Sequence, residues 1–349
     1  MTTRLQPVPR MGLKSILSAH PDHVLSGPDQ TMFPLGGCDH VWFDRVLTRN
    51  AGGATEYLRA CDLPQEDLDR VSAPRPHLCG LSMDRPRVLG ILNVTPDSFS
   101  DAGAFHSLDT AVARAHEMAQ EVDLLEIGGE STRPGAKEVA EDEELRRTAP
   151  VIQAIRDAGI KTPISIDTRK ASVARAALEA GADIVNDVSG LRHDPDMLGL
   201  VIEYDVPTCL MHSRGTPEIM ASLTEYEDVL LEIYDDIAAQ VEAAVAAGIR
   251  RERLIVDPGI GFAKTLEHNM TLLRGLSIFH DFGAPILLGA SRKSFIRIIG
   301  GGEEAKDTLG GSVAVALQGA MQGAQILRVH DTRATSQAIR MHVALQQDD

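Results

Sequence analysis

From residue 87 to the end of the chain, apolar and polar positions follow one repeated order. A short apolar run comes first, a polar loop follows, and a longer stretch then has apolar residues three to four positions apart. The short runs are typical of strands buried on both faces, and the longer stretches of amphipathic helices. Eight such runs predict strands at 87–93, 124–130, 163–168, 184–189, 208–213, 254–259, 286–291 and 326–331.

Helical stretches separate the predicted strands, and the clearest is YEDVLLEIYDDIAAQVEAAVAA at 226–247, with its acids opposite its apolar face. Several helices end just before the next strand at a glycine, which supplies the left-handed residue that reverses the chain. These glycines are Gly159, Gly181, Gly248, Gly283 and Gly323.

The number of strand–helix units decides between two α/β architectures. An open doubly wound sheet usually carries GxGxxG after its first strand, whereas this chain has NVTPDSF. Eight units in roughly 250 residues are the size of a (β/α)8 TIM barrel. We therefore predict this barrel over residues 86–349.

Residues 1–85 do not share the repeated order, and we predict an N-terminal extension of unknown role that is partly folded against the barrel. The segment HVWFDRVL, around the only tryptophan, Trp42, is a candidate strand. The segment CDLPQEDLDRVSAPRPHL resembles a linker with a short helix.

Composition narrows the class of partner. The 349 residues carry a formal net charge of -16, which argues against a nucleic-acid or anionic-membrane partner but leaves a small anionic substrate open. The four cysteines show no metal-site spacing, and no apolar run is long enough to cross a membrane. We expect free thiols and a cytoplasmic location.

Polar side chains stand at or just after the end of every predicted strand. One such residue is often only a helix cap, but eight together are poorly explained by capping. In a barrel, all eight carboxyl ends meet at one mouth, where active sites are built. The set is Asn93, Glu130 to Arg133, Asp167, Asn186 and Asp187, His212, Asp257, Ser291 to Lys293, and Arg328, His330 and Asp331.

These side chains divide by chemistry into two groups. Asp167, Asn186 and Asp257 offer the carboxylate and amide groups that suit a planar nitrogen heterocycle. The second group is cationic and comes partly from the loops after strands 7 and 8, the usual phosphate site of these barrels. Its members are Arg133, Lys293, Arg328 and His330. The mouth is therefore predicted to hold a heterocycle beside a phosphate or diphosphate.

Eight segments in order resemble the dihydropteroate synthase family: ILNVTPDSFSDAG, GGESTRPGA, ISIDTRK, IVNDVSG, LMHSRGTP, DPGIGFAKTLEHN, GASRKSF and ILRVHD. The resemblance implies a transferase of folate biosynthesis that joins 6-hydroxymethyl-7,8-dihydropterin diphosphate to 4-aminobenzoate and releases pyrophosphate. It also implies Mg2+ as the cofactor and a sulfonamide target. We expect a homodimer, because the small-residue run GGSVAVALQGAMQGA can pack against the barrel or against a second subunit.

The resemblance also implies roles for single residues. Asn93 would take the metal and pyrophosphate role, and Thr132 and Arg133 would sit on the second mobile loop. Asp167, Asn186, Asp257 and Lys293 would hold the pterin, and Arg328 and His330 the diphosphate. The catalytic set is Arg133, Lys293, Arg328 and His330. Phe99 and Pro134 would wall the aminobenzoate pocket, and Phe262 and Ser291 complete the substrate-binding set.

Two alternatives and two single residues stay open at this point. A methyltetrahydrofolate-binding methyltransferase barrel would lack the cations of SRKS and RVHD, and a catalytically silent pterin-binding paralogue would not need the intact loops. We interpret His212 as a core histidine with satisfied hydrogen bonds. Arg214, where many relatives have an uncharged residue, is interpreted as a solvated loop residue rather than a cation at the mouth.

Overall fold

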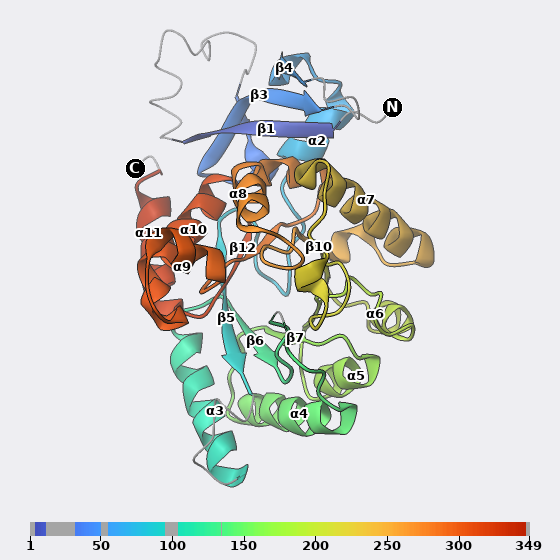
Figure 1. The fold of residues 1–349 in the computed structure, drawn as a ribbon, viewed down its shortest axis with the longest axis vertical. Helices are drawn as coiled ribbons and strands as arrows, with labels where there is room; N and C mark the ends of the chain where they lie inside the picture. The colour runs from blue at the N-terminus through green and yellow to red at the C-terminus, as the bar shows by residue number, and fades with distance from the viewer. Residues whose placement is uncertain (1–3, 12–31, 50–54, 95–103, 134, 347–349) are drawn as a thin grey trace.

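The computed structural model describes residues 4–11, 32–49, 55–94, 104–133 and 135–346. Eight parallel strands form the predicted barrel, in the order β10-β9-β8-β7-β6-β5-β12-β11 (Figure 1). A parallel bridge between Val256 and Ile286 brings β11 back beside β10 and so closes the ring. The strands are β5 (Arg87–Asn93), β6 (Leu124–Gly128), β7 (Ile164–Asp167), β8 (Ile184–Asp187), β9 (Thr208–Met211), β10 (Leu254–Asp257), β11 (Leu287–Gly289) and β12 (Ile326–Val329).

Helices surround the ring and bury their apolar faces against it in one large core. Asp228 caps the long helix that the sequence predicted, with its side chain accepting from Leu230 N and Leu231 N at 3.1 Å. The five predicted helix-ending glycines all adopt positive φ, which confirms their role. The helices are α3 (Ala104–Ala119), α4 (Glu141–Asp157), α5 (Ala171–Glu179), α6 (Met197–Tyr204), α7 (Val229–Ala247), α8 (Leu266–Arg274), α9 (Ser294–Gly300), α10 (Leu309–Met321) and α11 (Thr332–Ala344).

The N-terminal residues form a second, antiparallel sheet with its own apolar core. The predicted strand around Trp42 is its central strand, and the predicted short helix is present as α2. The rest of the sheet was not predicted. Its elements are β1 (Arg4–Met11), β2 (Phe33–Pro34), β3 (Val41–Arg49), β4 (Thr55–Arg59) and α2 (Gln65–Ser72).

Asp281 joins this sheet to the barrel. It lies in η6 (Leu276–Phe282), the segment between α8 and β11. Its carboxylate accepts from Leu5 N at 2.9 Å, Arg70 Nε at 2.7 Å and Tyr234 Oη at 2.7 Å. The extension is therefore tied to the barrel by a buried acid on which three donors converge.

The end of the barrel opposite the polar strand ends is filled by side chains. Leu78 and Met83, from the segment before β5, pack against the first residues of the barrel strands, among them Leu89 and Leu124. The last part of the predicted extension is thus a floor for the barrel. Within the described ranges, no helix is both long enough and apolar enough to cross a membrane.

Candidate active site

Strand register places three of the predicted polar positions, and Gly128 between them, in one row at the mouth. Asn93 of β5 pairs with Gly128 of β6, Gly128 with Asp167 of β7, and Asp167 with Asn186 of β8. A side chain at Gly128 would come close to Asp167 Cβ, at 3.5 Å, and Asn93 Oδ1, at 3.8 Å. Glycine at this position leaves the space between the amide and the carboxylate open.

A buried acid that the sequence analysis did not single out, Glu126 of β6, stands two residues before Gly128 and contacts the side chains at the mouth. Its carboxylate accepts from Asn186 Nδ2 at 2.8 Å and from the Arg328 guanidinium, which also donates to Asp167 Oδ2 at 2.7 Å. Burial alone would lower the pKa of Arg328, but Glu126 and Asp167 raise it instead, so the guanidinium stays charged. Arg328 of the predicted cationic group therefore donates to Asp167 of the predicted acidic group, so the two groups are in direct contact.

Asp167 is a buried acid at the mouth with spare hydrogen-bonding capacity. Burial, and then the charge of Glu126, raise its pKa. Its Oδ1 atom is buried and has no hydrogen-bond partner among the described residues. Buried carboxylate oxygens are almost always paired in proteins, so an unpaired one at a mouth marks a position for a ligand donor.

The opposite wall of the mouth comes from the loops after β10 and β11. Asp257 accepts from Gly259 N at 2.7 Å, and burial raises its pKa although the charge of Lys293 opposes this. Lys293 donates to the Ile260 carbonyl, and its Nζ lies 4.6 Å from the centroid of the Phe262 ring. Burial lowers the pKa of Lys293 to about 7.

His330 differs from its predicted charge. Burial, followed by the charges of Arg328, Arg292 and Arg133, lowers its pKa to about 4, so the imidazole is neutral near pH 7. The prediction of a cation at this position is wrong because burial, and then the charges of nearby guanidinium groups, disfavours the protonated ring. The backbone N–H of His330 donates to Ser291 Oγ at 3.3 Å, which joins the ends of β11 and β12.

A cavity of about 640 Å³ opens at this mouth, within the size range of small-molecule sites. Most of the predicted site residues line it: Asn93, Thr132, Arg133, Asp167, Phe262, Ser291, Lys293, Arg328 and His330. Asn186 and Asp257 lie beneath this lining, 4% and 5% exposed. Phe99 and Pro134 lie outside the described residues.

Glu126 and Glu130 are the functional candidates that the sequence analysis missed. Glu126 sits within the apolar run LLEIG, and an acid in the middle of a buried strand is itself a signal, because an isolated buried charge is costly. Glu130 stood in the strand-end set without a role. It lines the cavity at the start of loop 2, the segment 131–140.

Two residues left open are held by specific contacts. His212 is fully buried between Asp236, at 3.1 Å, and Lys264 Nζ, at 3.0 Å, which confirms the core interpretation. Arg214 is 30% exposed, lies over the Tyr226 ring at 3.8 Å and donates to Glu232 at 3.0 Å, so it is a partly exposed loop residue that its neighbours hold in place.

The model of the pterin binding enzyme family matches residues 89–330, which span all eight barrel strands except the first two residues of β5. The fold and the acid-lined mouth therefore define a pterin-binding barrel enzyme.

Comparison with named proteins narrows this class. The dihydropteroate synthase of Synechocystis sp. is 48% identical over 262 residues, covering 75% of this chain and 90% of that protein. The Escherichia coli K12 dihydropteroate synthase is 44% identical over 263 residues, covering 75% and 92%. A solved structure of Xanthomonas albilineans dihydropteroate synthase with 4-aminobenzoic acid superposes with a TM-score of 0.73 at 45% identity, covering 79% of this chain and 99% of that one. The chain belongs to the dihydropteroate synthase family.

Proposed function

We propose which residues at the mouth of this barrel bind each part of the substrates in the family's reaction. That reaction joins 6-hydroxymethyl-7,8-dihydropterin diphosphate to 4-aminobenzoate, giving 7,8-dihydropteroate and pyrophosphate, and it is the transferase step of folate biosynthesis that this chain performs. The observation that carries the assignment of residues is the buried Oδ1 atom of Asp167, which has no hydrogen-bond partner among the described residues. Asn186 lies beside Asp167 on the next strand, and Asp257 lies on the opposite wall.

The acids bind the pterin ring. Asp167 and Asp257 accept from ring N–H and amino groups, and Asn186 offers an amide that can donate or accept. In a pocket closed to water, a carboxylate facing these donors also stabilises the positive charge that develops on the ring as the C–O bond to the diphosphate breaks. Glu126 keeps Asn186 and Arg328 in place, because it accepts from both.

The cations receive the leaving group. Arg133, Lys293 and Arg328 line one cavity, and Thr132, Ser291 and neutral His330 add hydrogen bonds beside them. As pyrophosphate departs, these groups stabilise the charge on its oxygens. Arg328 belongs to the cations that receive the leaving group and also contacts acids at the pterin site, because its guanidinium donates to Glu126 and Asp167.

The arylamine attacks the methylene carbon, forms the new C–N bond, and loses a proton to solvent or to the departing pyrophosphate. An arylamine is uncharged at neutral pH, so we assign no general base. Phe262 and Lys293 form the described part of the aminobenzoate wall, which Phe99 and Pro134 would complete. Positioning of the two substrates and exclusion of water supply much of the remaining rate.

Mg2+ fits the donors at the mouth, and Asn93 would hold it. Mg2+ prefers oxygen ligands, keeps several waters and often takes phosphate oxygens from its substrate, so one protein amide oxygen is a sufficient anchor. The Asn93 side chain lines the cavity next to Asp167. When bound, the ion would neutralise charge on the diphosphate. Within the described ranges, the structure holds no cluster of three His, Cys, Asp or Glu side chains that could bind a metal without substrate.

We also propose a homodimer. Large apolar side chains are exposed on the adjoining helices α9, α10 and α11: Ile298, Ile299, Leu309, Met321 and Met341. Ile298→Asp should shift sedimentation toward a monomer, whereas Ile202→Asp, on α6, should not.

A cytoplasmic location suits the four cysteines, which are all unpaired. Sulfonamides would compete for the aminobenzoate wall, as a sulfonamide complex of the Yersinia pestis enzyme suggests.

The experiment for this proposal measures 7,8-dihydropteroate formed from both substrates, with and without a chelator. Arg133→Ala should raise the KM for the pterin diphosphate on the order of tenfold, through loss of a charge-assisted contact. Pterin binding without product in the unsubstituted chain would indicate the silent paralogue instead.

A further inference from the structure

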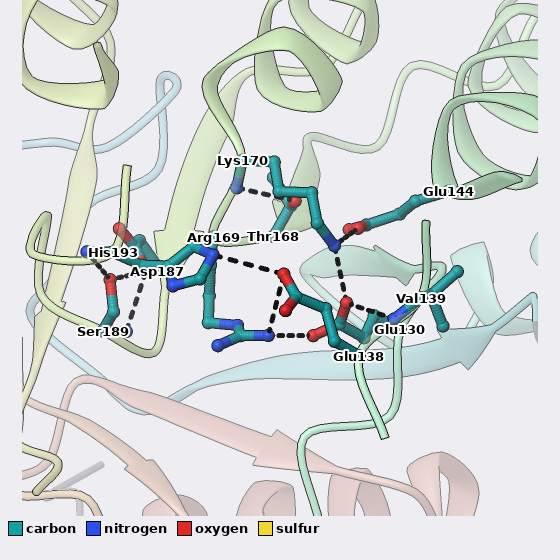
Figure 2. Close-up of polar contacts among 10 residues, drawn as sticks. All are labelled: Glu130, Glu138, Val139, Glu144, Thr168, Arg169, Lys170, Asp187, Ser189 and His193. Atoms are coloured by element: carbon teal, nitrogen blue, oxygen red, sulfur yellow. Dashed lines mark hydrogen bonds and ion pairs between the residues drawn. The ribbon is translucent and has the colours of Figure 1, made fainter. Parts of the chain in front are cut away.

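Four charged side chains are buried together at the base of loop 2, and we call Glu130, Glu144, Arg169 and Lys170 the loop-base cluster (Figure 2). Lys170 Nζ donates to Glu130 Oε2 and to Glu144 Oε2, both at 2.6 Å, and Arg169 Nη2 donates to Glu130 Oε1 at 2.5 Å. All four side chains are at most 9% exposed. Two acids balance two cations, so the cluster is neutral as a whole.

Stability alone is a poor reason for such a cluster. Removing four charges from water costs as much as their attraction returns, and apolar residues of the same volume are often at least as stabilising. What a buried ionic network adds is a defined geometry for the segments it joins. The question is therefore which segments this cluster fixes.

The cluster joins loop 2 to the rigid part of the barrel. Glu130 stands at the start of the loop and also accepts from Val139 N, near its end, at 3.0 Å. Arg169 and Lys170 follow β7, and Glu144 belongs to the first turn of α4. One carboxylate thus holds both ends of the loop, and Lys170 connects that carboxylate to the helix.

Neighbouring contacts are consistent with a fixed base. A side chain at Gly129 would meet Thr148 Cγ2 at 2.8 Å and Glu144 Cγ at 3.0 Å, so this glycine lets α4 approach the loop. Burial opposes ionisation of Glu130, yet the hydrogen bonds from Lys170 and Val139 lower its pKa. Burial likewise opposes the charge of Lys170, yet its hydrogen bonds to Glu130 and Glu144 raise its pKa, so Glu130 and Lys170 form a charged pair at neutral pH.

The segment held in this way carries the residues assigned to the diphosphate. Glu130 lines the active-site cavity together with Thr132 and Arg133, which follow it by two and three residues. We propose that Glu130 and Lys170 are positioning residues, which set the base of loop 2 so that Thr132 and Arg133 reach the diphosphate. This inference rests on the proposed function of loop 2.

The test compares two ligands on the full chain. Calorimetry gives the affinities for the pterin diphosphate and for the corresponding pterin alcohol, which lacks the diphosphate. Lys170→Met should weaken binding of the diphosphate about tenfold, the size expected for loss of a charge-assisted contact, and lower kcat. Binding of the alcohol should change less than twofold, because the pterin acids are untouched. Lys170→Arg, which keeps the charge, should restore most of the difference.

Glu144→Gln removes only the charge on α4, so it should weaken binding of the diphosphate but not of the alcohol, by less than Lys170→Met does. This variant keeps the proposal testable if Lys170→Met does not fold. The matched control is Glu203→Gln, which alters the exposed Arg175–Glu203 ion pair on the outer face of the barrel and should change neither affinity.

Two outcomes would overturn the proposal. The first is a lower Tm for Lys170→Met with an unchanged preference for the diphosphate, which would make the cluster purely structural. The second is an equal loss of both ligands. If loop 2 does not bind the diphosphate at all, the result is different, because the unsubstituted chain and Arg133→Ala would then bind the diphosphate equally well.

Discussion

Two buried aspartates at different ends of the barrel show how structure and function are separated in this molecule. Asp281, where the N-terminal sheet joins the barrel, accepts hydrogen bonds from three donors between 2.7 and 2.9 Å away. Asp167, at the mouth, accepts from Arg328 and keeps one buried oxygen without a partner among the described residues. Both are nearly inaccessible, at 4% and 6% exposure. For these two aspartates, burial does not distinguish the joint from the site, whereas unused hydrogen-bonding capacity does.

The largest expected effect lies at the joint. Asp281→Ala would leave the Arg70 guanidinium, the Tyr234 hydroxyl and Leu5 N without their common acceptor, and breaking such a buried set costs about 3 kcal/mol or more. Urea unfolding should show this loss. Measured below the transition, kcat should stay unchanged, and a large fall in kcat with little loss of stability would contradict the comparison.

Asp167→Asn should have the opposite profile. The amide keeps the shape but loses the charge facing the pterin donors, so affinity for the pterin diphosphate should fall by about 2 kcal/mol, or roughly thirtyfold. The free energy of unfolding should stay within about 1 kcal/mol, because the amide oxygen of asparagine can still accept from Arg328 and the other oxygen makes no described contact. Calorimetry measures the affinity, and urea unfolding measures the stability of the same protein. An unchanged affinity would exclude Asp167 from the pterin site.

A smaller effect should follow pH through Lys293. Its pKa is lowered to about 7, so the free enzyme loses the positive charge as pH rises through that value. Between pH 7 and 8 the charged fraction falls about fivefold, and the affinity for the diphosphate should weaken by a similar factor.

The ligand also titrates, so the informative quantity is the part of this pH dependence that Lys293→Met removes. An identical pH profile in the two proteins would assign the effect to the ligand alone.

The barrel was predictable from the sequence because each strand is an apolar run with polar residues at or just after its end. The prediction placed the first strand at its observed bounds and extended the other seven beyond them, because it included residues such as Glu130 and Ser213 that follow the last residue of the observed strand. Most of the site followed from the same rule, since the carboxyl ends of barrel strands converge.

The N-terminal sheet was missed for a physical reason. Pro7 and Pro9 of β1 argue against a strand, yet β1 lies at an edge of its sheet, where proline is tolerated, and its register shifts between these two residues. Glu126 was missed because sequence reading followed strand ends, whereas this acid acts from within a strand. The lowered pKa of His330 depends on its burial and then on the charges of three arginines, and only the fold supplies both.

Release of pyrophosphate from the pterin diphosphate, followed with and without 4-aminobenzoate, tests the central claim most directly. If the unpaired acid at the mouth is the pterin site of a transferase, the unsubstituted chain and Asp281→Ala should release pyrophosphate in step with 7,8-dihydropteroate and only slowly without the amine. Asp167→Asn should lose this activity at limiting pterin diphosphate. Release at the same rate without 4-aminobenzoate, or an undiminished rate in Asp167→Asn, would contradict the account.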